Sequence, residues 1–222
     1  MKYREGKLYR MIGAVILLLV ALLVFIPLIW LVVSSFKSDA DVIKWPPAFW
    51  PAEWVITQYH YVLSVLPIGN MLKNTVVFAG TVTLVSLFID SLAAFAFARM
   101  SFRGKNVIFT LILMTMMVPF QIIMIPLYLE EFKLGILDTL WGLVLPRAAG
   151  AYGIFMLTSF FSRIPKELEE AARIDGLNNF QIYYKIILPL SKPALISLGI
   201  YHFMNNWNDL LYPMMLTNNI NN

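Results

Sequence analysis

Charged residues are scarce in this sequence and cysteine is absent. Of the 222 residues, 14% are charged and 59% are hydrophobic, whereas a soluble chain has about 25% charged and about 45–50% apolar residues. The lack of cysteine excludes a disulfide scaffold and a thiolate metal site. The two histidines, His60 and His202, stand far apart, which argues against a histidine-based metal centre. Together with a mean hydropathy of +0.72, this composition indicates an integral membrane protein.

Five segments are apolar over roughly the 20 residues that a helix needs to cross the hydrocarbon layer. They are residues 11–33, 76–98, 107–129, 140–161 and 194–216. The first is longer than the about 7–15 apolar residues of a cleavable signal peptide, so we predict an uncleaved anchor. The sequence therefore predicts an all-α polytopic transmembrane helix bundle that forms a single domain over residues 1–222.

The placement of Lys and Arg predicts the orientation of these spans. Twelve of the 17 bases lie in segments 1–10, 99–106 and 162–193, and five lie on the other side. We therefore predict a cytoplasmic N-terminus, and the net charge of +4 gives no reason to expect a nucleic-acid partner. On the outside, the Trp- and Pro-containing segment 36–73 predicts a loop with short helical pieces in contact with lipid headgroups.

The cytoplasmic segment 162–193 is long for a connection between two helices. Pro165, the acids that follow it and Gly176 predict a first helix. Asn178 or Asn179 is expected to cap a second helix, which Pro189 ends. Segment 162–193 holds five bases and four acids, a nearly balanced charge. Helices that lie on lipid usually have an excess of bases, so this balance favours docking onto a protein partner.

The same segment resembles the EAA loop of bacterial ABC-importer permease subunits. The family pattern EAA-x3-G-x9-I-x-LP is matched at every defined position, from Glu170 to Pro189, and an acid before the glycine, here Asp175, is also usual. Segments 34–37, 93–99, 141–146 and 206–213 resemble the carbohydrate branch of that family. The chain is similar there to the smaller permease subunit of the maltose type. Family members normally have six helices, so this chain is expected to be truncated at its C-terminus.

The resemblance implies a coupling role for the loop, which would sit in a cleft of an ATP-hydrolysing subunit. The residues that it assigns to coupling are Glu170, Ala171, Ala172, Asp175, Gly176 and Pro189. It also implies a bacterial plasma membrane location, a second permease subunit, two copies of the ATPase and an external solute-binding protein. ATP and Mg would bind the ATPase, because this chain has no Gly-x4-Gly-Lys-Ser/Thr loop. We expect no catalytic set, cofactor or metal in the chain itself.

Polar side chains inside the predicted spans are candidates for a solute path, because an ionisable group in hydrocarbon usually faces protein or water. The candidates are Asp90, Gln121, Asn205, Asn206 and Asp209. For Asp90, a role in pairing helices is an equal alternative. The amides and acid near residue 206 match sugar hydroxyls as donors and acceptors, or they line the outer end of a cavity or join the partner permease. Transport of a solute other than sugar, and an ATP-independent carrier or anchor, remain the competing functions.

Overall fold

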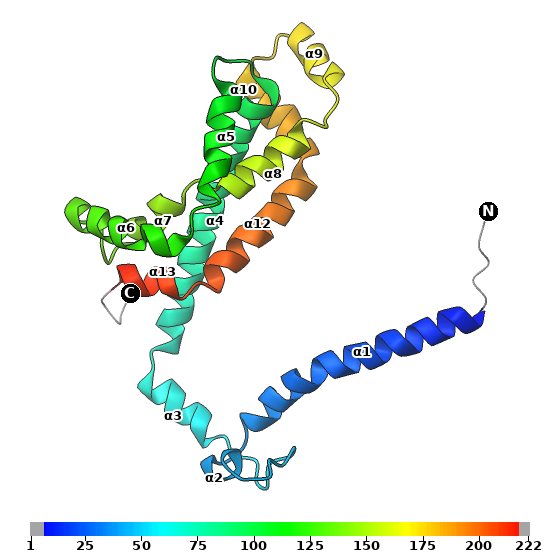
Figure 1. Cartoon of the computed structure of the whole chain (residues 1–222), viewed down its shortest axis with the longest axis vertical. Coiled ribbons are helices and arrows are strands. Elements are labelled where there is room, and N and C mark those ends of the chain that lie inside the picture. Colours follow the sequence, from blue (N-terminus) through cyan, green and yellow to red (C-terminus); the bar gives the residue numbers. More distant parts are fainter. Residues whose placement is uncertain (1–6, 218–222) are drawn as a thin grey trace. The chain divides into compact units, whose positions relative to one another are not determined.

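Helices account for all the regular structure in the computed structural model, which describes residues 7–217 and contains no strand in that range (Figure 1). The predicted all-α class is confirmed. The chain divides into two compact units, Met1–Ile68 and Gly69–Asn222.

The first unit contains one long apolar helix and a folded loop. Helix α1 (Lys7–Ser34) covers the predicted anchor, and the loop holds the short helices α2 (Asp39–Val42) and α3 (Thr57–Val65). After α1, Lys37 is only 4% exposed. Its Nζ donates to the Ala48 carbonyl at 2.6 Å and lies 4.0 Å from the centre of the Trp30 ring. This buried lysine holds the tryptophan-containing loop against the end of α1.

The second unit is organised along α4 (Ile68–Arg99), which begins eight residues before the predicted span. At 1.5 Å per residue its 32 residues extend roughly 48 Å, more than the hydrocarbon thickness. The elements after it are α5 (Lys105–Thr115), α6 (Phe120–Leu134), α7 (Leu140–Val144), η1 (Leu145–Arg147), α8 (Ala151–Phe161), α9 (Glu167–Ile174), α10 (Asn179–Ile182), the π-helix η2 (Tyr183–Ile187), α11 (Leu188–Leu190), α12 (Lys192–Trp207) and α13 (Leu211–Leu216).

Several predicted spans are bent or interrupted. Helices α5 and α6 meet at 98°, with Pro119 at the break, and the α7–η1 segment meets α8 at 47°. The segment α10–α11 meets α12 at 80°. In the described residues, two helices are long and apolar enough to cross a membrane, Tyr9–Ser34 and Ile68–Arg99, and there are five candidates if each bent pair is one span. The predicted number of five spans stays a prediction.

The end of the second loop helix differs from the prediction. Pro189 does not end it, because α11 carries the helical path through the proline to Leu190. The π-helix η2 comes directly before it, and its hydrogen bonds skip one residue more than those of an α-helix. The Leu188 N–H, just before the proline, already bonds to the Tyr183 carbonyl five residues back. The regular i to i−4 pattern is therefore interrupted before Pro189, and the helix continues without the hydrogen bond that a proline cannot donate.

Two apolar clusters lie at different levels of α4. One contains Ala94 and Phe95 of α4 with residues of α8, α9, α10, η2 and α12. The other contains Phe78 and Val82 of α4 with residues of α7 and α13. Helix α4 is thus the element that both clusters share.

Candidate functional site

Helix α9 carries the candidate coupling residues, and a glycine turn fixes its end. Gly176 has a φ of +84°, a left-handed conformation that favours glycine. Asn178 then begins α10 with a capping box, in which its side chain and that of Gln181 each accept a backbone N–H at 2.9 Å. The predicted helix, turn and cap are confirmed, with Asn178 as the capping residue.

The coupling candidates fall on different faces of the loop. Glu170, Ala171 and Asp175 are exposed, and so is Pro189 on α11. Ala172 is only 5% exposed because it packs into the first apolar cluster of this same chain. The outward surface of α9 therefore includes Glu170 and Ala171, whereas Ala172 faces inward.

A buried ion pair ties α9 to the end of α4. Arg99 Nε lies 2.9 Å from Glu169 Oε1, and the two side chains are 3% and 9% exposed. The Arg99 guanidinium also donates to the carbonyl oxygens of Ile164, at 2.6 Å, and Phe161. Neither residue stands out in the sequence, where a basic residue at the end of an apolar helix is an ordinary sign of topology.

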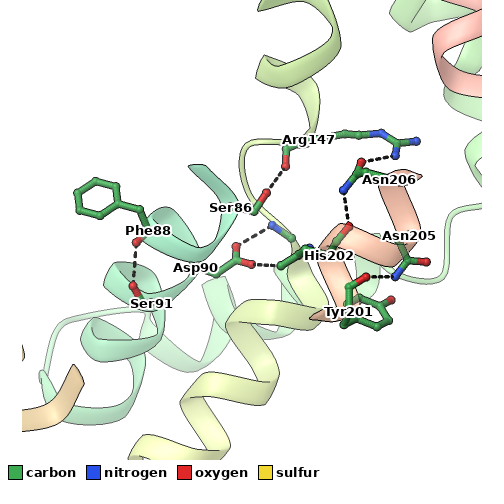
Figure 2. A network of polar contacts seen from close by, with 10 residues as sticks. Ser86, Phe88, Asp90, Ser91, Arg147, Tyr201, His202, Asn205 and Asn206 are labelled. Carbon is green, nitrogen blue, oxygen red and sulfur yellow. Dashed lines mark hydrogen bonds and ion pairs between the residues drawn. The ribbon is translucent and has the colours of Figure 1, made fainter. Parts of the chain in front are cut away.

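Asp90 lies at the centre of a second polar cluster (Figure 2). Its side chain is fully buried, accepts the Gly150 N–H at 2.7 Å and lies 3.0 Å from His202 Nε2. These contacts join α4, the start of α8 and α12. A Cβ at Gly153 would lie 1.9 Å from Asp90 Oδ2, so α8 approaches α4 as closely as a glycine allows.

Arg147 organises the neighbouring polar cluster on the same side of α12. It donates to Asn206 Oδ1 at 2.7 Å and forms an ion pair with Asp209. Its guanidinium lies 3.9 Å from the centre of the Tyr212 ring. Asn206 also donates to the His202 carbonyl at 2.7 Å, which connects the two clusters (Figure 2). A lone arginine within an apolar segment needs an acidic partner, and that signal could have paired Arg147 with Asp209 from the sequence.

A cavity of about 480 Å³ opens beside this cluster. Asn206 and Asp209 line it, together with Asn74, Thr139 and Trp207. The other three path candidates are not among its lining residues: they are Asp90, which is buried, and Gln121 and Asn205, which are exposed. Within residues 7–217, no three His, Cys, Asp or Glu side chains are placed to hold a metal ion.

Comparison with known proteins finds similar transport proteins. The profile of the family described as "binding-protein-dependent transport system inner membrane component" matches residues 90–221. The polygalacturonan/rhamnogalacturonan transport system permease protein YtcP of Bacillus subtilis is 33% identical over 96% of this chain and 74% of its own length. The arabinooligosaccharides transport system permease protein AraQ of Halalkalibacterium halodurans is 30% identical, over 89% and 72%.

A solved structure is similar over the whole chain. It is a bacterial ABC transporter involved in the import of the acidic polysaccharide alginate. The match has a TM-score of 0.84 and 29% sequence identity, and it covers 100% of this chain and 78% of the other.

Proposed function

Because the chain belongs to the family of binding-protein-dependent transport system inner membrane components, we propose that it is a permease subunit of a bacterial ABC importer for oligosaccharides. The observation that carries the proposal is its likeness, over nearly the whole chain, to permeases named for polygalacturonan/rhamnogalacturonan and arabinooligosaccharides. The match to an alginate importer supports the same class of solute. The chain's long apolar helices fit a membrane protein, and we propose that its N-terminus is cytoplasmic.

Helix α9 is the proposed docking element for a cytoplasmic ATPase. Its outward surface combines Glu170 and the small Ala171 with Ile174, an isoleucine that is 87% exposed. An exposed apolar side chain beside acids suits a cleft in a protein partner better than water. The complete importer would contain two ATPase copies, a second permease subunit and an external solute-binding protein.

The proposed mechanism is alternating access. ATP binding closes the two ATPase subunits and carries the 166–186 region with them, so that the attached membrane helices tilt. The driving free energy is the difference in ATP affinity between the two conformations, because a ligand shifts an equilibrium only through such a difference. ATP and Mg would act on the ATPase, and this chain would transmit movement.

The cavity beside Asn206 and Asp209 is the proposed place of solute contact. An amide both donates and accepts hydrogen bonds and a carboxylate accepts them, which matches the hydroxyl groups of a sugar. Trp207 also lines the cavity and offers an apolar ring face to a sugar ring.

Reconstitution of the complete importer in proteoliposomes tests the proposal. Uptake is measured for a panel of labelled neutral oligosaccharides, uronate oligosaccharides, amino acids and phosphate esters, each with its binding protein. We expect uptake of an oligosaccharide that requires both ATP and the binding protein. Uptake of only an amino acid or a phosphate ester would favour an importer of another solute, and uptake without ATP would favour a carrier of a different type.

A further inference from the structure

The last residue of α4 is a buried arginine. The side chain of Arg99 is 3% exposed although it lies at the cytoplasmic end of the helix, where water and headgroups are close. A buried guanidinium must be paired to avoid a large desolvation penalty. An arginine at this place is therefore held by specific partners.

Those partners come from two further elements. One is Glu169 on α9, whose Oε1 lies 2.9 Å from Arg99 Nε. The others are backbone carbonyls, that of Phe161 at the end of α8 and that of Ile164 in the turn before α9, the latter at 2.6 Å. The Arg99 Nη2 group donates to both carbonyls while the Nε side of the guanidinium forms the ion pair with Glu169, a division between two sides of one planar group that the single ammonium of a lysine cannot reproduce in the same geometry.

A second contact joins the loop to α4 eight residues earlier. The hydroxyl groups of Ser91 and Tyr183 lie 2.7 Å apart in a buried position. The ring of Phe95, on the same helix, lies 5.5 Å from that of Tyr183 between centroids. Eight residues correspond to roughly 12 Å along a helix. Attachment at two levels this far apart prevents the loop from pivoting about a single point on α4.

We propose that Arg99 is the positioning residue that makes α9 move together with α4 and α8. This inference rests on the proposed coupling function of α9. When the ATPase displaces α9, the Arg99–Glu169 contact and the two carbonyl contacts pass the displacement to α4 and to the end of α8. Without Arg99, α9 still docks on the ATPase through its outward surface, but the membrane helices follow it less.

The experiment compares Arg99→Met with Arg103→Met in the reconstituted importer. Arg103 is an exposed arginine four residues further along that makes no hydrogen bond or ion pair within residues 7–217, so its substitution removes the same charge without the buried contacts. Three quantities are measured: co-purification of the ATPase, ATP hydrolysis with and without loaded binding protein, and solute moved per ATP. For Arg99→Met we expect normal co-purification and a drop of about tenfold in solute moved per ATP, within the range seen when a coupling contact is lost. Arg103→Met should behave like the wild type.

A charge exchange distinguishes this arrangement from a simple ion pair. In the double variant Arg99→Glu, Glu169→Arg the pair of charges is restored, but the glutamate then faces two carbonyl oxygens that it cannot bind. We expect the double variant to remain uncoupled, whereas Arg99→Lys, which keeps one donor group, recovers part of the ratio.

Two results would overturn the inference: an unchanged ratio of solute to ATP in Arg99→Met, or full recovery in the exchanged double variant. If Arg99→Met fails to accumulate in the membrane, the amount of solute moved per ATP is measured instead in Arg99→Lys and in Glu169→Gln, which leaves the carbonyl contacts intact. An unchanged ratio in both variants would then overturn the inference. A wild-type complex that binds no ATPase would instead reject the proposed function. A wild-type complex that transports normally, with a fully coupled Arg99→Met variant, would reject only the role of Arg99.

Discussion

Substitution of Gly153 by alanine tests the close contact between α8 and α4. The new Cβ would lie 1.9 Å from Asp90 Oδ2, 2.8 Å from Asp90 Cγ and 3.1 Å from His202 Nε2. The carboxylate cannot turn away freely, because Asp90 is fully buried and holds the Gly150 N–H and the His202 ring. Either the carboxylate loses these partners or the helices separate.

The magnitude follows from the cost of a buried charge that loses its partner, about 3–5 kcal/mol. Alanine in place of glycine in a helix returns about 0.5–1 kcal/mol of backbone entropy, so we expect a net loss of about 3 kcal/mol. For a chain of this size 1 kcal/mol corresponds to about 2–4 °C in Tm. The apparent Tm of the protein in detergent micelles, followed by tryptophan fluorescence, should therefore fall by about 6–12 °C.

The matched control is Gly80→Ala. Gly80 lies within α4, and nothing lies within 4 Å of its Cβ position, so the Tm should stay level or rise slightly. Asp90→Ala provides the second control, because it removes the oxygen that the new methyl group meets. In that background Gly153→Ala should cost far less than in the wild type. Equal costs in both backgrounds, or an unchanged Tm for Gly153→Ala, would refute the contact.

Three further predictions concern the ATPase surface, the arginine cluster and the topology. Ala171→Arg places a long charged side chain on the outward surface of α9, so co-purification of the ATPase should be lost, whereas Asn106→Arg on exposed α5 should retain it; equal retention would argue against docking through α9. Arg147→Met leaves an acid of the cluster without its cation, so transport should fall several-fold with the ATPase still bound, and unchanged transport would separate this cluster from the solute path. The chain has no native cysteine, so single cysteines report topology: an impermeant maleimide should label Gln58→Cys in intact cells and Asn178→Cys only in opened cells, and the reverse pattern would invert the orientation.

Local signals in the sequence predict the backbone of segment 162–193 well. Gly176 has a positive φ at the turn where the pattern places a glycine. Asn178 caps the second loop helix as expected from its residue type and position. Caps and left-handed turns depend on a few neighbouring residues, which is why a single sequence is enough to find them.

The path of the backbone through the membrane is less accessible to sequence analysis. Mean hydropathy reports the composition of a segment and is insensitive to its direction, so it does not record the 98° angle between α5 and α6. The sign of the bend in the sequence is Pro119, which lies at the break. The inward position of Ala172 is equally hidden, because the helix pattern groups residues on a face but does not show which face meets the core.

The contacts of Asp90 bear on the two roles that the sequence left open for it. Its partners, Gly150 and His202, lie 60 and 112 residues away, so no local pattern connects them. The side chain is fully buried and absent from the lining of the cavity, which favours helix pairing over contact with a solute. A carboxylate in an apolar span is tolerated where protein donors surround it. Two other polar side chains of α4 also meet other segments: Ser86 donates to the Arg147 carbonyl at 2.7 Å, and Arg99 donates to the Ile164 carbonyl at 2.6 Å, so Ser86, Asp90 and Arg99 mark three places where other segments are attached to this helix.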